Sequence, residues 1–125
     1  MGAVVILDGQ VVARAGNERE LRQDPTAHAE VLALRAAAET LGSWRLDGTT
    51  LVVTLEPCPM CAGAILGARV ARVVFGAANT ENGSCGTLYN LCVDPRLNHE
   101  VEVVHGVEAE AATALLDEFF AARRP

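Results

Sequence analysis

Short apolar runs along the chain predict a sheet, because they are rich in Val, Ile and Leu and stand between polar segments. We expect strands at residues 3–7, 10–15, 49–55, 72–77 and 99–107. Asp8-Gly9 lies between the first two runs, and this dipeptide favours a tight hairpin turn. The run at 49–55 is almost continuously apolar, which is typical of a strand buried on both faces.

Longer segments with apolar residues at helical spacing predict helices between the strands. We expect helices at residues 24–41, 57–67 and 108–124, and a short helical piece at 86–92. Asp24 suits the N-cap of the first helix, Pro25 its first position and Gly42 its C-terminal cap. Residues 16–23 are polar and predict a loop.

The order of these elements is ββαβαβ(α)βα. Strand–helix–strand units imply parallel neighbouring strands with helices on both faces. We therefore predict an α/β fold, a three-layer α/β/α sandwich with a five-stranded mixed sheet. No repeat, linker or low-complexity tract interrupts the sequence, so residues 1–125 are expected to form a single domain.

Composition narrows the class of protein. Half of the 125 residues are hydrophobic, which argues against disorder and suffices for a packed core. No apolar run approaches the roughly 18 residues of a membrane span, and no signal peptide is recognisable, so we expect a cytoplasmic protein. The net charge of −6 argues against indiscriminate nucleic-acid binding and leaves a local basic patch open.

Two short motifs place metal-binding side chains at the starts of two predicted helices. His28 and Glu30 stand near the start of one helix, and Cys58 and Cys61 form a C-x-x-C at the start of the next. Without a secretion signal, C-x-x-C indicates metal or redox chemistry rather than a disulfide. The carboxyl ends of parallel strands meet at one edge of a sheet, so the two helix starts are expected to converge.

This donor set predicts a catalytic zinc site. One imidazole, from His28, and two thiolates, from Cys58 and Cys61, leave the fourth tetrahedral position for water. On a regular helix, Glu30 is about 200° around the axis from His28, so the two side chains cannot point to the same side of the helix. They can serve one site only if that site lies at the N-terminal end of the helix. We interpret Glu30 as a general acid/base and not as a ligand. H-x-E followed by P-C-x-x-C is also the signature of zinc-dependent nucleobase deaminases.

Longer stretches resemble the bacterial tRNA-specific adenosine deaminases of the cytidine deaminase superfamily. The likeness covers nearly the whole chain and includes DPTAHAEVLALRAAA, TLEPCPMCAGAI, RVVFGA, LNHEVEV and ALLDEFFAARR. The resemblance implies a cytidine deaminase-like fold, a Zn2+ cofactor, a homodimer and hydrolytic conversion of adenosine to inosine at the tRNA wobble position. Glu30 then moves protons while water attacks C6 of a flipped-out adenine.

The resemblance also implies contacts with the tRNA anticodon loop. The substrate-binding residues that it indicates are Asn17, Ala29, Asn79, Phe119, Phe120, Arg123 and Arg124. Asn17 matches an asparagine that holds the purine edge, and the four tail residues match positions near the anticodon loop.

The chain departs from the family in three places. Asn79 stands where an acidic residue near the substrate ribose is common, and Glu81 stands where a basic residue is common. The helix that usually precedes the first strand is expected to be absent, which predicts an exposed apolar patch near residues 3–7.

Two other functions fit the metal motif. One is a free-base guanine deaminase, which shares the zinc chemistry, and the other is a non-catalytic zinc-binding subunit that docks RNA. Retention of Glu30 argues against the second, since a structural zinc site does not require it. We interpret Cys85 and Cys92 as buried thiols rather than ligands, and His99 and His105 as structural.

Overall fold

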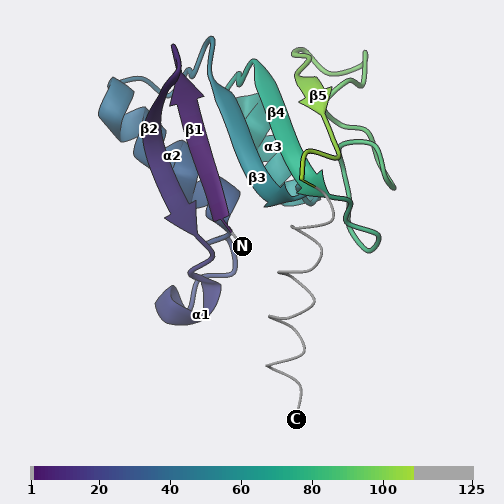
Figure 1. The fold of residues 1–125 in the computed structure, drawn as a ribbon, viewed down its shortest axis with the longest axis horizontal. Helices are drawn as coiled ribbons and strands as arrows, with labels where there is room; N and C mark the ends of the chain where they lie inside the picture. Colours follow the sequence, from purple (N-terminus) through teal and green to yellow (C-terminus); the bar gives the residue numbers. More distant parts are fainter. Residues whose placement is uncertain (1, 109–125) are drawn as a thin grey trace.

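The computed structural model describes residues 2–108, in which five strands form one mixed sheet in the order β2-β1-β3-β4-β5 (Figure 1). The strands are β1 Gly2–Leu7, β2 Gln10–Gly16, β3 Thr50–Leu55, β4 Arg72–Ala77 and β5 Glu102–Val104. β1 runs antiparallel to β2 and β3, whereas β4 runs parallel to both β3 and β5. The predicted five-stranded mixed sheet is confirmed.

The first two strands form the predicted hairpin. Leu7 pairs with Gln10 across the turn, where Asp8 and Gly9 have φ values of 51° and 77°. Positive φ at both central residues is the reason that Asp-Gly is favoured in such turns. The register shifts between Val5 and Ile6, so β2 carries an additional residue in a bulge.

Two helices cover one face of the sheet. They are α2 Ala29–Leu41 and α3 Pro59–Gly67, and both lie behind the strands in Figure 1. Their apolar side chains join those of the strands in one hydrophobic core. None of the described helices has the length and apolar character needed to span a bilayer. The helix predicted at 108–124, which supplies the expected third layer, lies outside the described residues.

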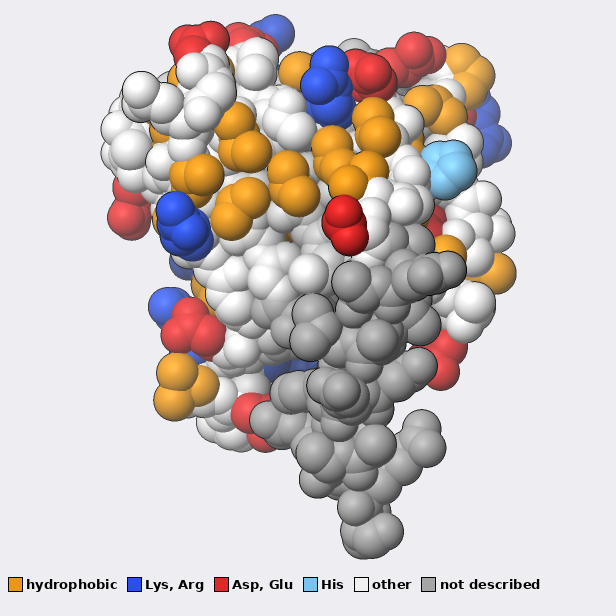
Figure 2. Space-filling model, viewed as in Figure 1, with side chains coloured by type: hydrophobic (Ala, Val, Ile, Leu, Met, Phe, Trp, Pro, Cys, Tyr) orange, Lys and Arg blue, Asp and Glu red, His pale blue; other side chains and the backbone are white. Residues whose placement is uncertain are grey.

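Burial alternates along the central strand. Leu51 and Val53 point into the core beneath the helices, whereas Val52 and Thr54 on the opposite face are half-buried. The strand is therefore buried on one face and half-buried on the other, so the prediction that 49–55 is buried on both faces is wrong. That opposite face carries an open, mainly apolar groove of about 630 Å³ between β1, β2 and β3, where Figure 2 shows apolar side chains gathered.

The first long helix starts later than the sequence predicts. Asp24 does not cap it, because residues 25–28 form a turn and the helix begins only at Ala29; within that turn the Asp24 carboxylate accepts hydrogen bonds from the N–H and hydroxyl of Thr26 at 2.9 and 2.7 Å. Pro25 therefore lies in this turn and not in the first turn of the helix. The N-cap of α2 is His28. Gly42 does end the helix in the left-handed conformation, with φ 66°, as predicted.

Other boundaries differ as well. The helix expected at 57–67 begins at Pro59, and its N-cap is Cys58. The short helix α1 Arg19–Arg22 lies in the segment predicted as a loop. The segment 86–92 forms turns and not a helix, since Gly86 has a φ of 133° that no helix contains. The strand expected at 99–107 is reduced to β5, and Gly106 follows it with a φ of 77°.

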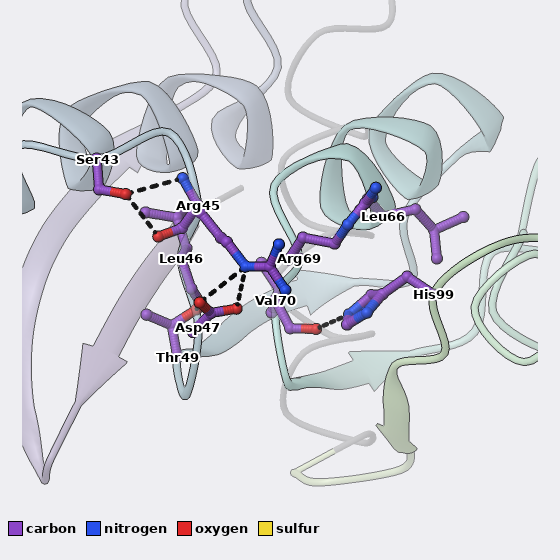
Figure 3. Close-up of polar contacts among 9 residues, drawn as sticks. All are labelled: Ser43, Arg45, Leu46, Asp47, Thr49, Leu66, Arg69, Val70 and His99. Carbon is purple, nitrogen blue, oxygen red and sulfur yellow. Dashed lines mark hydrogen bonds and ion pairs between the residues drawn. The ribbon is translucent and has the colours of Figure 1, made fainter.

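Local hydrogen bonds hold the end of the sheet where β3 and β4 begin (Figure 3). Arg45 makes an ion pair with Asp47 at 2.9 Å, and the Thr49 hydroxyl donates to the Leu46 carbonyl at 2.6 Å. His99 lies on the other side of this end, where its Nε2–H donates to the Val70 carbonyl at 2.8 Å. This contact agrees with the structural role predicted for His99.

Substitution of two neighbouring valines of β3 tests which face of the sheet packs against the hydrophobic core. Val53→Ala removes two methyl groups from a site that is 5% exposed, so we expect the free energy of unfolding to fall by about 2 kcal/mol. Val52→Ala makes the same change on the half-buried face and should cost less than half as much. Urea denaturation of both variants measures this, and an equal loss would contradict the assignment of the core.

Candidate functional site

The site lies where two helices begin. His28 is the N-cap of α2 and Cys58 is the N-cap of α3, and both have extended backbones, with ψ of 152° and 174°. Neither side chain makes a capping hydrogen bond to its own helix. Both are therefore available to a ligand at the helix mouths, where unpaired N–H groups and the helix dipoles give a positive potential.

The structure brings the predicted ligand residues together. His28 Nδ1 lies 3.4 Å from Cys61 Sγ and 3.7 Å from Cys58 Sγ. All three ligand atoms lie within 4.8 Å of one another, and no other His/Cys/Asp/Glu group of this kind occurs within residues 2–108. Tetrahedral zinc with bonds of about 2.0–2.1 Å to nitrogen and 2.3 Å to sulfur places those atoms about 3.6 Å apart. The donor types and their spacing therefore fit zinc.

The surroundings shift the pKa values of the two thiols in opposite directions. The hydrogen bond from the Cys61 thiol lowers the pKa of Cys58 to about 5, against the opposing effect of burial. The same hydrogen bond, together with burial, raises the pKa of Cys61. A metal binds each sulfur as a thiolate, so metal binding at this pair releases whatever proton the thiols still carry.

Glu30 is the buried acid beside these ligands. It is 7% exposed, and burial raises the pKa of its carboxyl, although hydrogen bonds from its own N–H and from Cys61 act in the opposite direction. Glu30 does not belong to the group of mutually close ligand atoms. A carboxyl with a raised pKa is suited to accept and return a proton near neutral pH. The neighbouring Ala29 packs its side chain into the core.

A second buried acid, Glu56, was not predicted as part of the site. It is 1% exposed and lies between β3 and Cys58. Burial opposes ionisation, but hydrogen bonds from Thr87, Cys85 and Asn79 lower the pKa of Glu56. The available signal in the sequence was a charged residue placed directly between a buried apolar strand and a metal motif.

The other predicted residues lie in loops or outside the described residues. Asn17 is exposed, and its side-chain oxygen accepts a hydrogen bond from the Arg19 N–H at 2.9 Å. The side-chain oxygen of Asn79 accepts from the N–H groups of Glu81 and Asn82 at 3.1 and 3.0 Å. Four predicted contacts lie beyond residue 108: Phe119, Phe120, Arg123 and Arg124.

The remaining two cysteines form a separate buried pair. The Sγ atoms of Cys85 and Cys92 lie 3.2 Å apart, and both residues are almost completely inaccessible. Neither joins the group of ligand atoms. Their burial agrees with the interpretation that they are packed thiols.

Comparison with known proteins identifies the class that this fold and site define. A family model described as MafB19-like deaminase matches residues 1–124, so the chain is a deaminase. A solved structure from work on A-to-I editing by tRNA:A34 deaminases is 41% identical, with a TM-score of 0.87 over 91% of this chain and 83% of that one. A guanine deaminase from Nitrosomonas europaea is 28% identical, with a TM-score of 0.77 over 96% of this chain and 72% of that one.

Sequence relatives narrow the class further. The tRNA-specific adenosine deaminase of Bacillus subtilis is 52% identical over 120 residues, which cover 96% of this chain and 74% of that protein. The enzyme of the same name from Haemophilus influenzae is 44% identical over 125 residues, 99% of this chain and 72% of that protein. The chain belongs to the family of tRNA-specific adenosine deaminases.

The metal-binding group can be tested with two buried cysteines. We expect freshly purified protein to hold about one zinc per chain, and Cys61→Ala to lose it because the site then has only two protein ligands. Cys92→Ala is the matched control, since Cys92 and Cys61 are both 0% exposed but only Cys61 lies near His28. Elemental analysis of the folded variants decides the matter. Full zinc in Cys61→Ala, or its loss in Cys92→Ala, would refute the assignment.

Proposed function

We propose that this protein is a zinc-dependent hydrolase that converts adenosine to inosine at the wobble position of tRNA. The observation that carries the proposal is a His28–Cys58–Cys61 donor group next to the buried Glu30. The choice of substrate is supported by sequence identity, which is 52% to a tRNA-specific adenosine deaminase and 28–33% to guanine deaminases.

Zinc is held by His28, Cys58 and Cys61 in this proposal. One nitrogen and two sulfur donors form a set that zinc binds with a fourth position open. When bound there, zinc would supply a Lewis acid that makes water nucleophilic near neutral pH. The positive ends of the α2 and α3 dipoles stabilise the two thiolates.

Glu30 moves the protons of the reaction. Its carboxylate accepts a proton from the water that attacks C6 of adenine and passes it to the ring nitrogen. It then takes the remaining proton from the hydroxyl now bonded to C6 and delivers it to the exocyclic amino group, which leaves as ammonia when the C6–N bond breaks. Burial raises the pKa of Glu30, which makes the carboxylate a better base for taking a proton from water and still allows it to give that proton to the substrate.

The substrate is the anticodon loop, and we propose a cytoplasmic homodimer on the basis of the family resemblance. Adenine binds beside Glu30, with Asn17 at the purine edge, the backbone of Ala29 at the helix mouth and Asn79 near the ribose. Phe119, Phe120, Arg123 and Arg124 contact the loop, because aromatic rings stack on unpaired bases and guanidinium groups bind phosphates.

Replacement of Glu30 by glutamine separates proton transfer from folding. The amide has nearly the same shape but cannot shuttle protons, so we expect kcat to fall at least 100-fold while zinc content and melting temperature stay near those of the parent. Single-turnover measurement of inosine formation tests this. A rate within a few-fold of the parent would remove Glu30 from the mechanism.

Substrate class is tested by an assay of the purified, zinc-loaded protein with two candidates. We expect inosine to form in an anticodon stem-loop RNA that carries adenosine at the wobble position, and free guanine to remain unchanged. Deamination of guanine alone would establish the free-base enzyme. Binding of the RNA without any deamination would establish a non-catalytic RNA-docking subunit.

Asn79 is expected to affect discrimination between RNA and DNA. An ionised carboxylate only accepts hydrogen bonds and so prefers a ribose 2′-OH, whereas a neutral amide is less demanding. Asn79→Asp retains a side-chain oxygen that can accept from Glu81 and Asn82, so the loop should keep its shape. We expect a higher ratio of RNA to DNA deamination in the variant, and an unchanged ratio would disprove this role.

A further inference from the structure

Glu56 is a buried carboxylate to which the mechanism assigns no task. It is 1% exposed, yet none of the ion pairs among the described residues involves it. A buried charge without a partner is costly, so its place in the fold requires compensation. Glu56 also lies only two positions before Cys58, on the segment that connects β3 to α3.

Hydrogen bonds from one distant loop supply that compensation. Oε1 accepts from the Asn79 N–H at 3.2 Å and from the Thr87 hydroxyl, and Oε2 accepts from the N–H groups of Cys85 and Thr87 at 2.9 and 3.1 Å. The donors follow Glu56 by 23 to 31 residues. Both oxygens are thus engaged by the segment 79–87, which contains no helix and no strand.

The loop is wrapped closely around the carboxylate. A Cβ atom on Gly83 would lie 2.6 Å from Glu56 Oε1 and 2.5 Å from the Asn79 carbonyl oxygen, so a larger residue does not fit there. The Ser84 N–H donates to the Pro57 carbonyl at 2.9 Å, which ties the loop to the residue immediately before Cys58. The shape of residues 79–87 is therefore set by the short stretch that leads into the metal ligands.

We propose that Glu56 is a positioning residue that holds the 79–87 loop in its substrate-binding shape beside the metal site. The inference rests on the proposed function, because Asn79 is the residue of this loop that approaches the substrate there. Glu56 anchors the Asn79 backbone, and the Asn79 side chain then orders Glu81 and Asn82. A single carboxylate thereby couples the geometry of the substrate loop to that of Cys58.

Glu56→Gln tests the proposal with almost no change in shape. The amide replaces one acceptor oxygen with an NH2 group. In place of Oε2 it leaves the N–H groups of Cys85 and Thr87 without an acceptor, and in place of Oε1 it leaves the Asn79 N–H without one, because the Thr87 hydroxyl can rotate to accept from it. We expect KM for the anticodon stem-loop to rise at least tenfold, while kcat per bound zinc changes less than threefold. A purely structural role would lower the active, zinc-loaded fraction and leave KM unchanged, and that result would overturn the proposal.

Two further variants keep the test decisive. Thr87→Val removes only the hydroxyl donor to Glu56 and should raise KM in the same direction by a smaller factor. Glu39→Gln makes the same chemical change as Glu56→Gln at an exposed position of α2 and should leave KM unchanged. If Glu56→Gln does not fold, an unchanged KM in Thr87→Val overturns the proposal.

Hydrogen exchange separates this inference from the proposed function. In Glu56→Gln, either the amide of Asn79 or those of Cys85 and Thr87, depending on which oxygen is replaced by NH2, should exchange at least tenfold faster, with the amides of β3 and α3 unchanged. This result is expected even if the parent protein proves inactive on RNA, in which case only the proposed function fails. Unchanged exchange at these three amides would overturn the role of Glu56 in holding the loop.

Discussion

Convergence of two helix N-termini is the constraint on which the site depends. His28 and Cys58 are the last extended residues before α2 and α3, and neither uses its side chain to cap its own helix. The packing of both helices on one face of the sheet brings His28 Nδ1 within 3.4–3.7 Å of the two sulfurs. A substitution that shifts the first residue of α2 or α3 therefore displaces a metal ligand directly, even where the core between the helices and the sheet stays packed.

Two buried glutamates show how the surroundings assign different tasks to one side chain. Burial raises the pKa of Glu30 at the metal site, which favours proton exchange. Hydrogen bonds from the loop overcome burial at Glu56 and lower its pKa, which keeps that carboxylate charged and holding its donors. Glu30 is thus suited to proton transfer, and Glu56 is suited to holding the loop that surrounds it.

The sequence predicts those features that depend on local patterns. Apolar runs and Asp8-Gly9 indicate the sheet and its hairpin, and two short motifs indicate His28 and the two cysteines as ligands. The predicted start of α2 at Asp24 is wrong, because an Asp that accepts from the N–H two residues on can begin a helix or an isolated turn, and here it forms a turn four residues before the N-cap His28. The loop around Glu56 was missed because its donors lie 23 or more residues away, and only the folded chain brings them together.

The proposed chemistry depends on a single zinc ion that binds two thiolates and one imidazole at the starts of two helices and retains an open position. X-ray absorption at the zinc edge of the purified protein tests this most directly. We expect two sulfur neighbours at about 2.3 Å and two nitrogen or oxygen neighbours at about 2.0–2.1 Å, one of which is exchangeable solvent. Four sulfur neighbours, or a sulfur-free shell, would contradict it.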